Sequence, residues 1–322
     1  MSNPIKIDLS GKIQRPTRDG YGEGLVLAGK ADPNVVVLCA DLTESTRSLA
    51  FKKEFPERFI QMGVSEQALV AIGVGLALDG KVPFTSSYAV FSPGRSWDQV
   101  RTNVCLNNVN VKIAGAHAGV SVGPDGATHQ ALEDIAITRV LPNMTVIYPC
   151  DAIEARKATV AAAELVGPVY LRYAREKTPI MTTDATPFAI GKAIVMREGT
   201  DCAIIACGPL LYNALVAAEE LAKTGINCRV VNNHTIKPLD EKAIVAAAAD
   251  CGAVVTVEEH QIAGGMGSAI AELLVQKKPV PIEFVGMRDS FGQSGEPNEL
   301  IAYYGMDAKG IVKAVKKVLK RK

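Results

Sequence analysis

Short apolar runs alternate with longer amphipathic stretches along almost the whole chain. Each short run is bounded by polar or turn-forming residues, which is typical of a buried strand in a parallel sheet. We expect strands near residues 35–39, 82–85, 111–115, 146–149, 169–173, 202–207, 228–232, 253–257 and 282–285, with a further short one before Gly63. Helical patterns lie over 15–29, 66–80, 151–165, 212–223, 241–249, 267–276 and 313–320. This alternation predicts an α/β fold with two parallel-sheet α/β domains and right-handed crossovers.

The alternation is interrupted over residues 176–187, where two prolines accompany a stretch without periodicity. Such a stretch is typical of a linker. We therefore expect a first domain over residues 1–176, a linker over 177–190 and a second domain over 191–322. A length of 322 residues suits two domains.

The expected helix over 66–80 has an unusual composition. From Ala68 to Leu78 it offers no polar side chain, and a helix that is apolar on every face is normally buried. Glu66 would then bring a carboxyl group into or near a buried place, where it must be paired, hydrogen-bonded or kept neutral. The alternative is a carboxylate that only complements the dipole at the start of the helix.

Composition and charge exclude several classes of protein. With 48% hydrophobic and 21% charged residues the chain has an ordinary globular balance. Its net charge of +1 gives no field that would gather nucleic acid, so an anionic ligand must be held by local charges. The seven cysteines lack C-x-x-C or zinc-type spacing, which indicates reduced core cysteines of a cytosolic protein.

The sequence also predicts a cytoplasmic protein with no membrane partner. The N-terminus lacks the apolar core of a secretory signal, and no apolar run reaches the length of a membrane span. The lysine-rich helix over 313–320 indicates a solvated charged face. The glycines over 264–267 lack the third glycine of a dinucleotide fingerprint, so they indicate a tight turn.

The densest group of reactive side chains lies between residues 116 and 130, directly after an expected strand. It contains His117, Ser121, Asp125, Thr128 and His129, with glycines interspersed. Side chains that follow a parallel strand lie at the edge where open α/β sheets bind ligands. Three interpretations are open: a metal site built from both histidines and Asp125, histidines that bind sugar hydroxyls or a phosphate, or a polar turn packed on the next helix.

Several motifs, in the same order, together resemble the transketolase family. Residues 125–130 (Asp-Gly-Ala-Thr-His-Gln), after His117, look like its pyrimidine-binding domain, and residues 63–67 (Gly-Val-Ser-Glu-Gln) resemble its glutamate motif. Further matches are Ala-Asp-Leu-Thr at 40–43, Leu-Pro-Asn at 141–143 and Tyr-Pro-Cys-Asp at 148–151. The resemblance extends across the second domain. It implies a thiamine-diphosphate pyrimidine-binding domain followed by a transketolase C-terminal domain.

This resemblance implies transfer of a two-carbon ketol unit between ketose and aldose sugar phosphates, as in the pentose phosphate pathway. The Gly-Asp-Gly … Asn motif, by which the family's preceding domain binds the diphosphate and its metal, has no counterpart in the sequence. The resemblance therefore implies one subunit of a split transketolase. Its partner would be an N-terminal transketolase-like subunit that holds the diphosphate and Mg²⁺ or Ca²⁺, with no metal ligand in this chain. Self-association into an α2β2 heterotetramer is expected.

Carried over residue by residue, the resemblance implies a set of cofactor contacts. Glu66 matches the catalytic glutamate that hydrogen-bonds N1′ of the cofactor's pyrimidine, where a carboxyl in an apolar pocket can share a proton with a weakly basic ring nitrogen. Tyr88 and Phe91 match aromatic residues that pack on that ring. Asp41 matches a residue near cofactor and substrate.

The resemblance implies substrate contacts as well. His117 and His129 match catalytic histidines of the substrate channel, and Asp125 matches the aspartate that binds a substrate hydroxyl. The residues that match the sugar-phosphate site are Arg18, Ser45 and Arg175. Arginine suits a phosphate because its planar fork gives charge-assisted, often bidentate hydrogen bonds.

The sequence departs from typical transketolases beside these positions. Ser65 and Gln67 flank Glu66 where Arg and His are usual, and Glu44 replaces a more usual proline. The flanks of Glu66 are closer to 1-deoxyxylulose-5-phosphate synthase, whereas His117 favours transketolase. Shifted spacing over 91–95 leaves the role of Arg95 open.

Two alternative functions are kept, the first of which follows from these departures. One is half of a 1-deoxyxylulose-5-phosphate synthase-like enzyme. The other is a non-catalytic assembly or regulatory subunit. A beta subunit of a 2-oxo acid dehydrogenase shares the implied architecture, but Asp125 and His129 argue against it.

Overall fold

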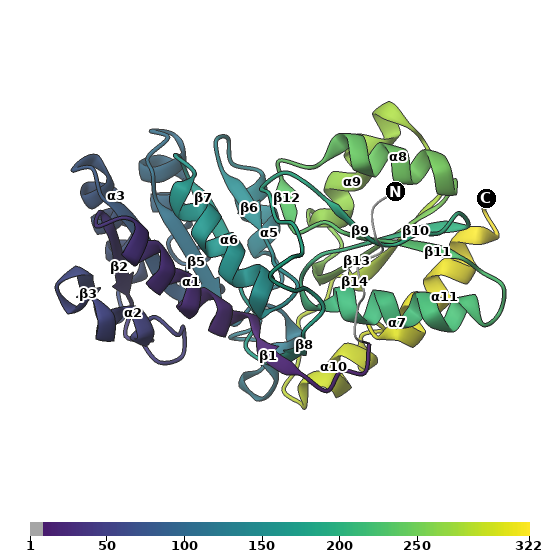
Figure 1. Ribbon diagram of the computed structural model, residues 1–322, viewed down its shortest axis with the longest axis horizontal. Helices are drawn as coiled ribbons and strands as arrows, with labels where there is room; N and C mark the ends of the chain where they lie inside the picture. The colour runs from purple at the N-terminus through teal and green to yellow at the C-terminus, as the bar shows by residue number, and fades with distance from the viewer. Residues whose placement is uncertain (1–8) are drawn as a thin grey trace.

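The computed structural model describes residues 9–322, which form two α/β units side by side (Figure 1). Each unit has a mostly parallel sheet covered by helices on both faces. The predicted fold class, two parallel-sheet α/β domains, is confirmed. Residues 1–8, the start of the expected first domain, lie outside the described residues.

The first sheet has seven strands in the order β12-β6-β7-β5-β4-β2-β3. These are β2 (Val35–Cys39), β3 (Phe59–Gln61), β4 (Val82–Tyr88), β5 (Lys112–Ala116), β6 (Thr145–Ile147), β7 (Val169–Arg172) and β12 (Thr235–Lys237). Neighbours run parallel, except that β12 is antiparallel to β6. Strands β2 and β5 are buried along their whole length, as the continuous apolar character of β2 predicts.

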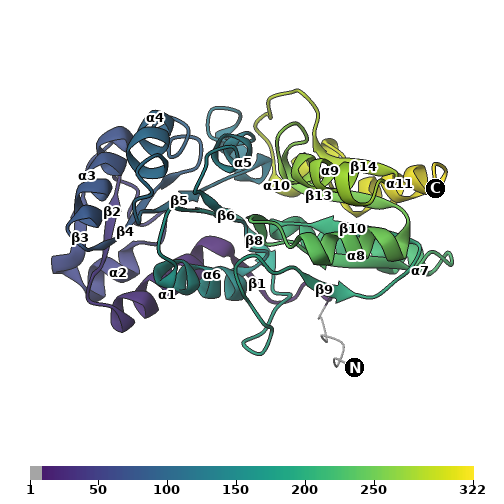
Figure 2. The same cartoon turned by 90° about the horizontal axis from the view of Figure 1, so that it is seen from above.

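Helices cover both faces of this sheet (Figure 2). On one face lie α1 (Thr17–Ala31) and α6 (Ala152–Glu164), and on the other α3 (Glu66–Leu78), α4 (Trp97–Gln99) and the π-helical turn η2 (Val100–Cys105). Shorter elements are α2 (Leu49–Glu54), η1 (Pro56–Arg58), η3 (Val120–Asp125) and α5 (Asp134–Arg139). Helix α6 begins at its predicted cap, since the Asp151 carboxylate accepts the Glu154 N–H at 2.9 Å.

The second sheet has five strands in the order β14-β13-β10-β11-β9. Its strands are β9 (Ile194–Arg197), β10 (Cys202–Ala206), β11 (Cys228–Asn232), β13 (Val254–Gln261) and β14 (Ile282–Met287), with β9 antiparallel to β11. Its helices are α7 (Leu211–Ala222), α8 (Glu241–Cys251), α9 (Met266–Lys277), α10 (Pro297–Tyr303) and α11 (Ala308–Leu319), with the turn η4 (Gly208–Leu210). In Figure 1, α8 and α9 lie above this sheet, and α7 and α11 below it.

Two strand pairings join distant parts of the chain. Strand β12 follows β11 in the chain, but it pairs with β6 of the first sheet. Strand β1 (Gln14–Pro16) pairs with β8 (Lys177–Pro179), which falls in the stretch expected to be a linker. The pattern of apolar residues did not predict β1, β8, β9 or β12, which have three or four residues each. The boundaries at 176 and 190 stay predictions.

Helix α3 corrects one expectation. It was expected to be buried on every face, but only Glu66, Leu69, Val70 and Gly73 of this helix are buried. Ile72 is 45% exposed and Leu78 is 74% exposed, and Val64 just before the helix is 73% exposed. An all-apolar helix with one open face is typical of an element that packs against another chain.

The remaining expectations on composition concern cysteines and membrane spans. All seven cysteines are free and buried, as predicted. Within residues 9–322, none of the helices combines the length and the apolar character needed to cross a membrane.

Candidate functional site

The candidate residues gather at the carboxyl ends of three neighbouring strands. Asp41 follows β2, Tyr88 ends β4 and His117 follows β5, and these strands are adjacent in the order β5-β4-β2. Asp41 and His117 both adopt left-handed backbone conformations, with φ of 58° and 56°. Such conformations are uncommon in residues other than glycine and are concentrated at functional sites.

The Glu66 carboxyl is buried at the start of α3 and is paired with Arg95. Glu66 is 2% exposed, and its Oε2 accepts a hydrogen bond from Arg95 Nη1 at 2.9 Å. The burial expected from the sequence is therefore confirmed for Glu66. The ion pair with Arg95 offsets the cost of burying its carboxylate. The pairing could not be predicted, because Arg95 is distant in sequence and its role had been left open.

Four rings form a cluster beside this ion pair. Tyr88 stacks with Phe91 at 6.1 Å between centroids and lies 4.0 Å from the His117 ring. His129 meets the rings of Phe91 and Tyr88 edge-on at 5.3 and 6.1 Å. The Arg95 guanidinium lies 4.7 Å from the centroid of Phe91. The rings thus connect Glu66 and Arg95 on one side with the two histidines on the other.

His117 is buried and neutral. Burial lowers its pKa to about 3, and the nearby cations Arg18 and Arg175 act in the same direction. Its Nε2 lies 3.2 Å from Arg18 Nη1, and a guanidinium can only donate, so Nε2 accepts and the ring proton belongs on Nδ1. That Nδ1 is buried and has no partner among the described residues. A buried donor left free is suited to a ligand.

A group of arginines surrounds His117. Arg18 Nη1 also donates to the Ser45 carbonyl at 2.9 Å. Burial lowers the pKa of Arg18, the positive charges of Arg47 and Arg175 act in the same direction, and Asp19 and Glu176 oppose them. Arg47 is paired with Asp19 at 2.7 Å and Arg175 lies near Asp125 and Glu176, so Arg18 is the cation of this group best placed to hold an anion.

The loop after β5 brings Asp125 toward Arg175. Arg175 Nη1 donates to the Val122 carbonyl at 2.6 Å and lies 3.9 Å from Asp125 Oδ2. Asp125 is exposed, and His129 is half-buried with its Nδ1 2.9 Å from Thr128 Oγ1. Asp41 is exposed as well, and its backbone N–H donates to Gln61 Oε1 at 2.9 Å.

The structure bears on two of the interpretations of the sequence. Among residues 9–322, no group of three or more His, Cys, Asp or Glu side chains is placed to hold a metal ion. His117, Asp125 and His129 therefore do not form such a site. The glycines over 264–267 form a tight turn, with Gly264 at φ 77°. The N–H groups that follow, of Met266 and Gly267, donate to Glu258 at 2.6 and 2.8 Å. These N–H groups at the start of α9 are therefore already bound within the chain. This agrees with a tight turn and not with a nucleotide site.

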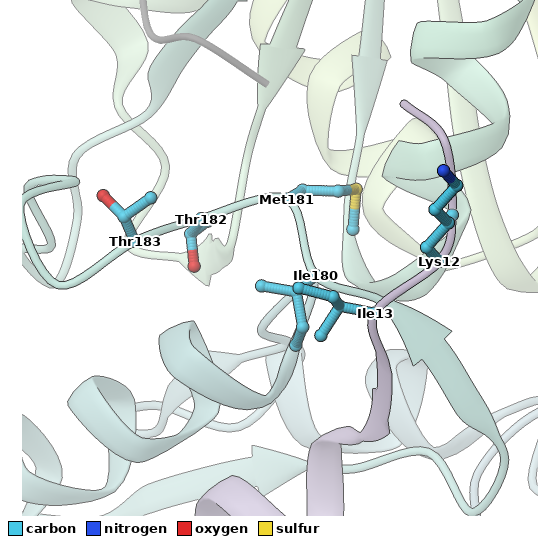
Figure 3. A pocket seen from close by; sticks show the side chains of 7 residues that line it. Lys12, Ile13, Ile180, Met181, Thr182 and Thr183 are labelled. Carbon is cyan, nitrogen blue, oxygen red and sulfur yellow. The ribbon is translucent and has the colours of Figure 1, made fainter. Parts of the chain in front are cut away.

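Two cavities lie away from these residues. One, of about 180 Å³, is lined by residues 11–13 and 180–183 where the β1–β8 ribbon ends (Figure 3). The other, of about 550 Å³, is lined by Arg139, Lys237, Glu272 and neighbours between β12 and α9. Neither lining includes a residue that the sequence singled out for chemistry.

Comparison with known families gives two matches that together span most of the chain. The transketolase pyrimidine-binding domain matches residues 14–181, and the transketolase C-terminal domain matches residues 191–311. A putative transketolase C-terminal section from Methanocaldococcus jannaschii is 44% identical over 98% of this chain and 99% of its own length.

Two further relatives are similar over their full length. A 6-deoxy-6-sulfo-D-fructose transketolase subunit from Clostridium sp. (strain MSTE9) is 39% identical over 100% of this chain and 99% of its own length. A solved structure, described as a split-gene transketolase in an inactive beta4 tetramer, superposes with a TM-score of 0.89 at 45% identity and covers 95% of this chain and 98% of that one. Transketolases depend on thiamine diphosphate. With both domain matches in the order found, and with relatives of this length and identity, the chain belongs to the transketolase family, among its split subunits.

Proposed function

We propose that this chain is the carboxyl-terminal subunit of a transketolase that transfers a two-carbon ketol unit between ketose and aldose sugar phosphates. The observation that carries the proposal is the convergence of a buried glutamate, a ring cluster, a neutral histidine and a group of arginines at one edge of the first sheet. An aromatic cofactor and an anionic sugar would need groups of these kinds in order to bind.

The residues present fit thiamine diphosphate at its pyrimidine end. Glu66 uses Oε2 for Arg95, which leaves Oε1 to share a proton with a ring nitrogen. Phe91 and Tyr88 offer aromatic faces beside it, and Asp41 lies at the end of the neighbouring strand β2. When bound, the cofactor supplies the carbanion chemistry, while the protein orients it and controls protons.

The chain's own residues can bind and orient the sugar. Arg18 and Arg175, with Ser45 beside them, provide donors and positive charge for the phosphate. The free Nδ1–H of His117 can donate to a sugar hydroxyl or carbonyl oxygen. His129 and Asp125 complete the polar lining, with Asp125 selecting a hydroxyl by accepting its hydrogen bond.

A partner subunit completes the proposal. It would be an N-terminal transketolase-like subunit with the Gly-Asp-Gly … Asn motif, which binds the diphosphate and Mg²⁺ or Ca²⁺. The relatives described as a C-terminal section and as a split-gene product support this division. The open apolar face of α3 would pair with a second copy of this chain, giving an α2β2 assembly.

The test is reconstitution with the partner chain. We expect ketol transfer from xylulose 5-phosphate to ribose 5-phosphate in the mixture with thiamine diphosphate and Mg²⁺, and none from either chain alone. Full activity of this chain alone would contradict the need for a partner. Pyruvate-dependent condensation with glyceraldehyde 3-phosphate in place of ketol transfer would favour the synthase alternative. A partner that is fully active without this chain would favour a non-catalytic subunit.

A further inference from the structure

The loop that carries Asp125 is held from the second domain. Glu259 lies on β13, it is 1% exposed, and its Oε1 accepts the Ser121 N–H at 2.6 Å. Ser121 belongs to η3, the turn that leads from His117 to Asp125. A residue more than one hundred positions away thus fixes the backbone of the candidate site.

Gly119 shows how closely the Glu259 carboxyl approaches this loop. Its φ of 88° lies in the region that favours glycine. A Cβ at this position would overlap the Glu259 carboxyl group. The Gly119 N–H donates to the Ala131 carbonyl at 2.9 Å. The loop is therefore held by Ala131 at Gly119 and by the Glu259 carboxyl at Ser121.

Three successive loop residues have backbone groups bound by buried or half-buried side chains. Gln130 Nε2 donates to the Val120 carbonyl at 3.0 Å and to the Gln293 carbonyl at 3.0 Å. Glu259 binds the N–H of Ser121, and Arg175 binds the Val122 carbonyl. In this set, Glu259 is the acceptor supplied by the second domain.

Glu259 is itself held rigidly. Its backbone carbonyl accepts a hydrogen bond from Arg172 Nη2 at 3.0 Å, and Arg172 is itself fixed by its buried pair with Asp134 in the first domain. The carboxyl ends of the second sheet, where open α/β sheets usually bind ligands, are here packed against the first domain: a Cβ on Gly208, after β10, would overlap the Tyr148 ring. The second domain therefore presents Glu259 to the site loop instead of a ligand site of its own.

We infer that Glu259 is a positioning residue, which fixes the loop over residues 119–125 and so places Asp125 and Arg175 for the sugar substrate. The inference rests on the proposed function where it concerns the reaction. The loop contact itself is a property of the chain.

The test compares three substitutions at this position. Glu259→Gln keeps an acceptor oxygen at the same reach, Glu259→Asp keeps the charge but is one methylene too short, and Glu259→Leu removes the acceptor. In the reconstituted complex we expect kcat/KM for the sugar phosphates to fall ~10- to 100-fold for Leu and Asp, because small misplacements of positioning groups lower the rate by factors of this size. This fall should come mainly from a higher KM, with the affinity for thiamine diphosphate unchanged. Glu259→Gln should have a kcat/KM close to that of the unmodified chain.

The matched control is Glu258→Leu. Glu258 is equally buried but binds the N–H groups at the start of α9. We expect it to lower thermal stability without raising the KM. If the Glu259→Leu variant does not fold, the inference is tested with the Glu259→Asp variant.

Amide hydrogen exchange separates the two parts of the inference. In the chain alone, Asp and Leu at position 259 should speed exchange in a peptide covering residues 119–125, while Gln should not. This holds even if no transketolase activity is found. Unchanged exchange and unchanged KM in Glu259→Asp would overturn the inference, as would a Gln variant as impaired as Leu, or an equal rise in KM in Glu258→Leu.

Discussion

Arg95 Nη1 lies 2.9 Å from Oε2 of Glu66, and this ion pair compensates a carboxylate that is almost fully buried at the start of α3. The arginine is half exposed and also lies over the Phe91 ring. Its exposed position lets it move without disturbing the core. Glu66, by contrast, is fixed by the helix that begins with it.

Removal of this arginine should destabilise the chain because it leaves a buried carboxylate unpaired. For Arg95→Met we expect a loss of about 1 kcal/mol, less than for a fully buried pair because Arg95 is half exposed to solvent. Chemical unfolding of the chain alone measures it. The exposed Arg101→Met is the control, and Arg95→Met combined with Glu66→Gln should cost less than the sum of the two. Strict additivity would show that the pair is not coupled.

Histidine 117 should stay neutral through the physiological range. Its pKa in the folded chain is about 3, set first by burial and then by Arg18, against an ordinary value of 6.5. Between these values the unfolded chain binds a proton that the folded chain does not. Proton binding at this residue therefore leaves stability unchanged above pH 6.5 and lowers it as the pH falls toward 3, by up to ~1.4 kcal/mol per pH unit.

Nuclear magnetic resonance of the imidazole nitrogens measures this directly. We expect no protonation of His117 between pH 8 and pH 5, and a raised pKa in Arg18→Gln, which removes the neighbouring cation. A midpoint near 6.5 in the unmodified chain would contradict the buried, neutral assignment.

The buried pair of Arg172 and Asp134 should stabilise the first domain where it meets the second, since Arg172 also donates to the Glu259 carbonyl at 3.0 Å. Both side chains are almost inaccessible, with Arg172 Nε 2.7 Å from Asp134 Oδ2, and Tyr170 donates to the same carboxylate at 2.5 Å. Because one unpaired charge would remain buried, Arg172→Met should cost about 3–5 kcal/mol of unfolding free energy. The double variant with Asp134→Leu should recover part of that cost. Loss of only a few tenths of a kcal/mol in Arg172→Met would show that the pair adds little to stability.

The open face of α3 should mediate self-association. Ile72→Glu or Leu78→Glu places a charge on the apolar surface and should dissociate the assembly while the far-ultraviolet circular dichroism stays unchanged. Light scattering after size exclusion measures the mass. Val275→Glu, at an equally exposed position on α9, should have no effect. An unchanged mass for both α3 variants would place the interface elsewhere.

Sequence reasoning predicted the elements whose information is local. Strand β2 and strand β11 have the predicted bounds, and Asp151 caps α6 as expected, because a continuous apolar run or a capping side chain is decided by near neighbours. Burial of Glu66 was predicted for the same reason. The apolar pattern alone did not predict the open face of α3, because the surface that a partner covers is apolar like a core.

Contacts between distant residues could not be predicted from one sequence. Arg95 reaches Glu66 only after β4 and the turn that follows it have folded against α3. Glu259 reaches Ser121 only once the second domain is docked, and neither has a motif of its own. The pairing of β12 with β6 is of the same kind, since it depends on how the two sheets meet.

The central claim, that Glu66 acts on the cofactor's pyrimidine in a transketolase subunit, is tested most directly by Glu66→Gln in the reconstituted complex. With the complex folded and loaded with thiamine diphosphate, we expect turnover to fall ~100-fold or more, as loss of acid–base catalysis usually does. Arg95→Met, which breaks the same ion pair but keeps the carboxyl, should retain most of the turnover. Near-normal turnover in a loaded Glu66→Gln complex would contradict the claim.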